Sequence, residues 1–183
     1  MIEQQTAMTE GDIIKRCQTG DREAFRAVVE KYQNVLFGTA YLMTGSRTIA
    51  EDHVQEAFLA AWKNIGSFRP GYPLKPWLVR ILVNKVLSYQ RTNANTMISL
   101  DDNSAIDPAG DDPAEDIAQR DQLRRVMQSL STEQRQVVLL RYFAGLSLAE
   151  TAAALGRRQG TVKSQTSRAL EQLRELITND NQS

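Results

Sequence analysis

The stretch from residue 93 to residue 116 constrains the fold most, because it divides the 183-residue chain into two blocks. It reads NANTMISLDDNSAIDPAGDDPAED, shows no helical periodicity and is rich in Asp, Asn, Pro and Gly, which is the composition of a linker. On both sides of it, apolar residues recur at three-and-four spacing, and no useful length of sequence alternates as a strand does. The sequence therefore predicts an all-α protein of two small helical domains, residues 1–92 and 117–183, joined by a flexible linker.

The formal net charge of zero hides a pattern of three blocks. Residues 1–92 carry 12 Lys/Arg and 9 Asp/Glu, the segment 93–116 carries 7 Asp/Glu and no Lys/Arg, and residues 117–183 carry 10 Lys/Arg and 6 Asp/Glu. Two mildly basic blocks suit a polyanionic partner, and the acidic linker would repel one. An ordinary solvated surface with a polar linker would give the same pattern, so charge alone leaves both interpretations open.

Cysteine and histidine usage narrows the possible chemistry. The chain has one cysteine, Cys17, and one histidine, His53, so it cannot form an internal disulfide or a zinc site made of its own N and S ligands. No nucleophile–base pair or metal-ligating cluster stands out, so we expect no enzymatic activity, cofactor or metal. The N-terminal segment is polar and acidic, and no apolar run approaches the roughly 20 residues of a membrane helix. We therefore expect a cytoplasmic protein.

Capping boxes mark where several helices begin. In such a box, Ser or Thr and a Glu or Gln three residues later satisfy two unpaired N–H groups. The chain has three of these pairs: Thr48 with Glu51, Ser131 with Gln134, and Ser147 with Glu150. Apolar spacing, with Gly and Pro as helix ends, predicts helices at 11–18, 21–43, 48–64, 77–91, 112–129, 132–145, 147–155 and 159–177. The third should bury a stripe of Val54, Ala57, Phe58, Ala61, Trp62 and Ile65.

Residues 147–155 and 159–177, with Gly156 between them, have the dimensions of a helix-turn-helix. In the second helix, the residues expected to pack inward are Val162, Thr166, Ala169, Leu170 and Leu173. The outward face carries Thr161, Lys163, Ser164, Ser167 and Arg168, and short hydroxyls with a long cation suit a helix in the DNA major groove. Arg157 and Arg158 stand at the helix entrance, where a phosphate contact is natural. An ordinary helical hairpin with a polar face remains the alternative.

A family resemblance makes this motif more specific. The segment LSTEQRQVVLLRYFAGLSLAETAAALGRRQGTVKSQTSRALEQLR, residues 130–174, closely resembles the fourth conserved region of bacterial sigma factors, in particular the extracytoplasmic-function (ECF) subfamily. Regulators of the LuxR type share a similar GTVK element. An autonomous LuxR-type helix-turn-helix transcriptional regulator therefore stays open on this segment alone.

The N-terminal block carries a second resemblance. AEDHVQEAFLAAWKNIGSF, residues 50–68, resembles the sigma-factor region that binds RNA polymerase, and KPWLVRILVNKVLSYQR, residues 75–91, resembles the helix that meets the promoter minus-10 element. Both regions occur in order with no third domain between them, which is the ECF arrangement, and together they cover about residues 8–177. The alternatives, which are a LuxR-type regulator, a helical adaptor and a small hydrolase, do not explain why these two segments are present.

The resemblance implies a specificity subunit, not an enzyme, with partners and sites to match. The partners would be core RNA polymerase, through its clamp coiled coil and flap, promoter DNA, and an anti-sigma factor, which in this family is often membrane-bound. The acidic linker resembles the segment that the family threads toward the polymerase active-site channel. The implied core-binding residues are Glu51, Asp52, Gln55 and Glu56, and the implied minus-10 contacts are Ser67, Phe68, Lys75, Arg80, Asn84 and Lys85. The implied minus-35 contacts are Arg157, Arg158, Thr161, Lys163, Ser164, Ser167 and Arg168.

The residue types agree with those roles. A helical face of carboxylates and an amide suits a basic partner surface. Single-stranded DNA needs stacking surfaces, hydrogen-bonding edges and cations along the backbone, which the minus-10 set offers. A role in capping the helix would explain the presence of Glu51 as well as a polymerase contact does. We expect the Trp77 ring to pack in the core of the domain and not on DNA. His53 stands where the family has an aliphatic residue.

Overall fold

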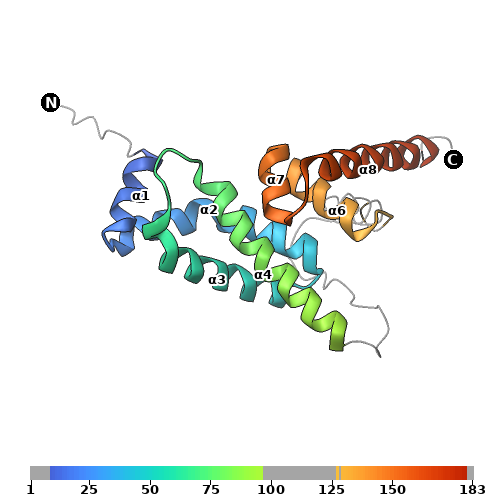
Figure 1. Ribbon diagram of the computed structural model, residues 1–183. Helices are drawn as coiled ribbons and strands as arrows, with labels where there is room; N and C mark the ends of the chain where they lie inside the picture. The colour runs from blue at the N-terminus through green and yellow to red at the C-terminus, as the bar shows by residue number, and fades with distance from the viewer. Residues whose placement is uncertain (1–8, 97–126, 128, 181–183) are drawn as a thin grey trace.

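The computed structural model describes residues 9–96, 127 and 129–180, and these residues form helices and connecting turns without any strand (Figure 1). The all-α prediction is therefore confirmed. Most of the predicted linker and the predicted helix at 112–129 lie outside the described residues. The elements are α1 (Glu10–Gln18), α2 (Arg22–Thr44), α3 (Arg47–Asn64), the 3₁₀ turn η1 (Ile65–Ser67), α4 (Leu74–Thr96), α6 (Thr132–Val138), the π-helical turn η2 (Leu139–Phe143), α7 (Leu148–Leu155) and α8 (Gln159–Asp180).

Two of the three predicted capping boxes are confirmed. At the start of α6, the Ser131 hydroxyl accepts the N–H of Gln134 at 3.2 Å, and the Gln134 side chain accepts the N–H of Ser131 at 2.9 Å. At the start of α7, Ser147 and Glu150 form the same pair of bonds at 3.2 and 2.7 Å. These reciprocal bonds fix where each helix begins.

The third predicted box is wrong. The N-cap of α3 lies two residues earlier than predicted, at Ser46, whose hydroxyl accepts the N–H of Ile49 at 3.4 Å. The reason is Gly45, which ends α2 in the left-handed conformation at φ 73° and leaves Ser46 as the first extended residue. Glu51 does not cap the helix, and its carboxylate instead accepts a bond from Arg47 Nε at 2.9 Å.

Helices α2, α3 and α4 pack together and bury the apolar faces that their spacing predicts (Figure 1). The predicted stripe on α3 is confirmed, since Ala57, Phe58, Ala61 and Ile65 are buried and Val54 and Trp62 pack against them. Pro76 lies in the first turn of α4, where its missing N–H costs little. This bundle is the framework that positions the surfaces described below.

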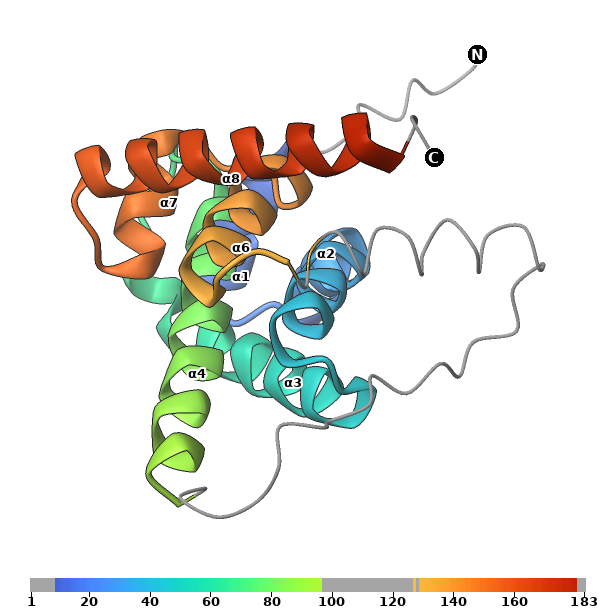
Figure 2. The same ribbon diagram turned by 90° about the vertical axis from the view of Figure 1, so that its right-hand side faces the viewer.

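The two halves of the chain also pack against each other (Figure 2). Helix α7 contacts α4, and η2 contacts α2. Leu146, Ala152 and Leu155 belong to the same core cluster as Leu36 and Val79. Residues of both predicted domains therefore belong to one hydrophobic cluster. Apolar spacing predicts that these faces are buried, but it does not tell that they meet.

Candidate functional site

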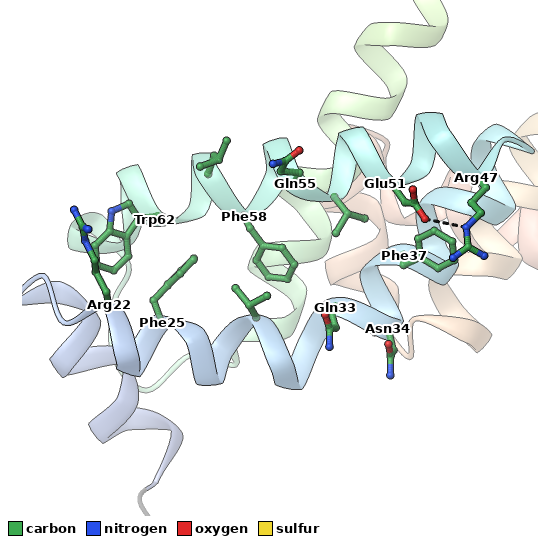
Figure 3. Close-up of a pocket in the computed structure, with 13 residues that line it drawn as sticks. Arg22, Phe25, Gln33, Asn34, Phe37, Arg47, Glu51, Gln55, Phe58 and Trp62 are labelled. Carbon is green, nitrogen blue, oxygen red and sulfur yellow. Dashed lines mark hydrogen bonds and ion pairs between the residues drawn. The ribbon is translucent and has the colours of Figure 1, made fainter.

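An open groove of about 750 Å³ runs between α2 and α3 (Figure 3). Its lining is apolar in the middle, where the Phe25 ring lies 6.4 Å from that of Phe58 and 5.0 Å from that of Trp62. Leu59 joins this lining and leaves 55% of its surface exposed. Polar side chains at the groove are Arg22, Gln33, Asn34, Arg47, Glu51 and Gln55. An apolar floor with polar neighbours is the kind of surface that receives an amphipathic helix.

The four predicted core-binding residues are not all in this groove. Glu51 and Gln55 line it, and Asp52 is exposed on α3 next to it. Glu56 faces α4 instead, where its carboxylate lies 3.0 Å from the Lys85 ammonium. That hydrogen bond, helped by the charge of Lys85, lowers the pKa of Glu56 below its usual value. Glu56, a predicted polymerase contact, thus forms an ion pair with Lys85, a predicted DNA contact.

A second, smaller depression of about 370 Å³ lies where the loop after α3 meets the start of α4. Phe68 is 7% exposed and its ring centroid lies 5.0 Å from that of Trp77, so both rings belong largely to the fold. The residues that line the depression are Ser67, Phe68, Arg69, Tyr72, Pro73, Pro76, Trp77 and Arg80, together with Glu150 and Ala153 of α7. It combines aromatic faces with two guanidinium groups, as a site for an unstacked base requires.

Tyr72 is a candidate that the sequence reasoning missed. The residue is 65% exposed, and it lines the depression together with Arg69. The sequence does place Tyr72 between Gly71 and Pro73, which indicates a short loop. A large aromatic residue in a loop does not belong to the buried face of a helix, so its exposure could have been predicted. Tyr72 offers a more accessible stacking surface than Phe68 does.

The remaining predicted minus-10 residues lie along α4. Arg80 and Asn84 are exposed one turn apart on the same face, as expected from their spacing. Lys85 is held by Glu56, and Lys75 is half-buried with its ammonium against the turn at Gly145. The structure thus brings Ser67, Phe68 and Arg80 together at the depression and leaves Asn84 further along the helix.

The outward face of the predicted recognition helix is exposed on α8. The exposed residues are Thr161, Lys163, Ser164, Ser167 and Arg168. The opposite face is buried through Val162, Thr166 and Ala169, as predicted, and Leu173 packs against the second hydrophobic cluster. The prediction that Leu170 packs inward is wrong, because 38% of its surface is exposed. The helix therefore presents hydroxyls and two cations on one accessible face.

The two arginines before α8 differ in their surroundings. Arg157 donates from Nη2 to the Gln136 side-chain oxygen at 2.8 Å and from Nη1 to that of Gln165 at 3.1 Å. Gln136 is buried, so Arg157 connects α8 to the interior of α6. Arg158 is exposed, and its carbonyl accepts the N–H of Val162 at 3.1 Å. Arg158 is the better placed of the two for a phosphate.

Neither metal ligands nor membrane helices are found in the part of the chain that the structure describes. No group of three or more His, Cys, Asp or Glu residues there could hold a metal ion. No helix there is long and apolar enough to cross a membrane.

Comparison with known proteins places both halves in one class. Residues 28–96 match the family described as Sigma-70 region 2, and residues 120–173 match Sigma-70, region 4. The groove and most of the depression are formed by the region 2 half, and the exposed helix α8 belongs to the region 4 half. The fold and these matches define a bacterial RNA polymerase sigma factor.

Individual relatives narrow the class. SigM of Mycobacterium tuberculosis, an ECF RNA polymerase sigma factor, is 32% identical over 92% of this chain and 85% of SigM. BldN of Streptomyces coelicolor, another ECF sigma factor, is 29% identical over 92% of this chain, which spans 66% of that longer protein. The structure is also similar to a chain in the co-crystal structure of the sigma factor RpoE with the anti-sigma factor NepR from Bartonella quintana. The two chains are 30% identical, and their TM-score is 0.67 over 84% of this chain and 96% of that one.

The chain belongs to the ECF family of RNA polymerase sigma factors. It directs RNA polymerase to promoters and is not itself an enzyme. The autonomous LuxR-type regulator is thereby set aside, because the region 2 match covers the segments that such a regulator would leave unused.

Proposed function

We propose that the groove between α2 and α3 binds the clamp coiled coil of core RNA polymerase. The observation that carries this proposal is the exposed apolar floor of the groove, with Leu59 at 55% exposure beside Gln55 and Glu51. A coiled-coil helix could bury Leu59, and its basic side chains would meet Glu51 and Asp52. Glu56, which is paired with Lys85, would contribute mainly by holding α3 against α4.

The depression beside α4 is proposed to take a base of the melted minus-10 element. Support comes from the exposed Tyr72 ring as a stacking platform and from Arg69 and Arg80 as backbone contacts. Ser67 and Asn84 supply hydrogen-bonding groups at the edge and further along α4. Phe68 is buried and would shape the depression rather than stack on DNA.

The exposed face of α8 is proposed to read the minus-35 element in the major groove. Arg168 has the length and fork geometry to contact a guanine edge, and Lys163 suits a phosphate or a base acceptor. Thr161, Ser164 and Ser167 can approach closely because their side chains are short. Arg158 would bind phosphate, whereas Arg157 would position the helix through Gln136 and Gln165.

An anti-sigma factor is the proposed negative regulator of this chain, which would act in the cytoplasm together with the polymerase. The support is the sequence and fold likeness to a chain from the complex of RpoE with the anti-sigma factor NepR. The groove between α2 and α3 is an accessible apolar surface that such a partner could cover. Occupation of the same groove would exclude the clamp coiled coil.

The groove assignment is tested by replacing Asp52 and Gln55 together with Ala. Both side chains are exposed, so thermal unfolding should change little, while competition with the wild-type chain for core polymerase should become several-fold weaker. The matched control is Glu171→Ala, an exposed acidic position on α8. Normal competition by the double variant would refute the assignment.

A further inference from the structure

Helix α1 lies beside the loop that begins with η1 and leads to α4, and this loop contributes to the proposed minus-10 depression (Figure 1). At the end of α1, the Gln18 side chain donates from Nε2 to the Ile65 carbonyl at 3.1 Å and to the Phe68 carbonyl at 2.7 Å. An amide nitrogen carries two hydrogens, so Gln18 can make both bonds at once. The Phe68 N–H also donates to the Ile65 carbonyl at 3.1 Å, which closes η1, so Gln18 holds a turn that is already formed.

The other end of the loop is attached to the same helix. Glu10 Oε2 accepts the N–H of Leu74, the first residue of α4, at 3.4 Å. Glu10 is itself held by the Lys31 ammonium of α2 at 2.8 Å. Along a helix that rises 1.5 Å per residue, Glu10 and Gln18 are about 12 Å apart. Helix α1 therefore fixes the two ends of the loop at a set distance from each other.

Burial along the loop matches these attachments. Ile65, Phe68 and Leu74, whose backbone groups α1 holds, are buried. The residues between them, which include Ser67 and Tyr72, are exposed. The points that α1 holds thus determine where the exposed side chains of the loop stand. A shift of these points would move the surface of the depression while the buried anchors stay in the core.

We propose that Gln18 is a positioning residue for minus-10 recognition, which sets where Ser67 and Tyr72 meet the unstacked base. This proposal rests on the proposed minus-10 site. Gln18 is not among the residues that line the groove or the depression, so it acts through the loop and not by touching DNA or polymerase. A loop that is held in place before DNA arrives loses less conformational entropy on binding, so its contacts contribute more to discrimination between bases.

The variant Gln18→Met tests the proposal, because methionine has a similar length and helix preference but cannot donate these bonds. The full-length chain with core polymerase transcribes a promoter library that is randomised over both elements. Preference at the minus-10 position whose base occupies the depression should fall about 3- to 10-fold, which is part of what one stacked base contributes. Preference across the minus-35 element should stay unchanged. Preference is a ratio between promoters in one reaction, so the amount of folded chain does not affect it.

Gln90→Met is the matched control. Gln90 is likewise half-buried, and its Nε2 donates to the Met43 carbonyl at 3.0 Å, toward the other end of α4 from the loop. This variant removes the same kind of bond from the same bundle, so it should lower the melting temperature about as much as Gln18→Met does. Its minus-10 preference should equal that of the wild type. A merely structural role for Gln18 would make the two variants behave alike.

Replacing Ser67 and Tyr72 together with Ala shows whether Gln18 acts through the loop. This double variant should lose preference at the same minus-10 position, and adding Gln18→Met should cost nothing more, because no contact is left to position. The inference is overturned if Gln18→Met keeps the wild-type preference, or if its loss simply adds to that of the double variant. If the double variant itself keeps the wild-type preference, the proposed minus-10 site fails and the inference fails with it.

Discussion

Arg157 and Arg168 illustrate what can and cannot be read at the scale of a residue. Helical spacing alone predicted that Arg168 faces outward, and it is exposed on α8. Arg157 was predicted to contact a phosphate at the entrance of the same helix, yet its guanidinium donates to Gln136 and Gln165. The partner Gln136 lies 21 residues away on another helix, and no local pattern signals such a pairing. Exposure follows from periodicity, whereas long-range hydrogen bonds require the packed structure.

Replacing Arg168 with Ala should flatten promoter preference at one or two positions of the minus-35 element. A bidentate contact between Arg and guanine gives about 1–3 kcal/mol of discrimination, which the shorter side chain cannot provide. Transcription from a randomised promoter library, with variant chain and core polymerase, measures this. Arg158→Ala is the comparison and should weaken all promoters alike while lowering the salt slope by about 1. An unchanged sequence preference for Arg168→Ala would contradict the assignment.

Replacing Arg157 with Ala should instead lower the stability of the C-terminal half. The buried Gln136 oxygen would lose its partner, and an unsatisfied buried polar group costs about 1–3 kcal/mol. Thermal unfolding of the purified chain measures the loss. Arg158→Ala again serves as the control and should stay within about 0.5 kcal/mol of the wild type. A wild-type melting temperature for Arg157→Ala would show that the two hydrogen bonds contribute nothing.

At the scale of elements, the helix starts follow from local chemistry, and the exceptions have local causes as well. The boxes at Ser131 and Ser147 needed only residues within one turn, so the sequence predicted them correctly. The start of α3 was misplaced because the left-handed Gly45 moves the cap to Ser46. The way α1 is attached could not be predicted, because Glu10 receives bonds from Lys31, Tyr32 and the backbone N–H of Leu74 on two other helices.

Glu10 makes the attachment of α1 depend on pH. Partial burial acts to raise its pKa, but the hydrogen bonds from Lys31, Tyr32 and the Leu74 N–H outweigh that effect and lower it below 4.5. A lowered folded-state pKa gives stabilisation that is complete above about pH 4.5 and is lost as the pH falls through the folded value. Glu10→Gln should therefore melt about 2–4 °C below the wild type at neutral pH, as expected for about 1 kcal/mol.

Melting curves between pH 3 and pH 7 test this expectation. The difference between wild type and Glu10→Gln should shrink as the pH falls below about 4.5. Glu171→Gln, at an exposed position on α8, is the control and should follow the wild type throughout. A difference between wild type and Glu10→Gln that is the same at every pH would mean that the charge of Glu10 does not hold α1 in place.

At the scale of the whole molecule, class and partners could be inferred from the sequence, but the arrangement of the halves could not. Two ordered motifs predicted an ECF sigma factor, and the matches to regions 2 and 4, together with the likeness to ECF relatives, confirm it. The contacts between α7 and α4 depend on how Leu146, Ala152 and Leu155 meet a bundle far away in sequence. The two basic blocks carry low net charges and offer few phosphate contacts, so we expect promoter binding to depend on the polymerase.

The most direct measurement is a gel-shift titration of promoter DNA by the chain, with and without core RNA polymerase, at physiological salt. The chain alone should bind duplex weakly and almost without sequence preference, because the proposed DNA surfaces lie in blocks of low net charge and offer few phosphate contacts. Its complex with core polymerase should bind tightly and select its promoter, because the polymerase holds both surfaces near the DNA and raises their effective concentration. Nanomolar, sequence-specific binding by the chain alone would contradict the account.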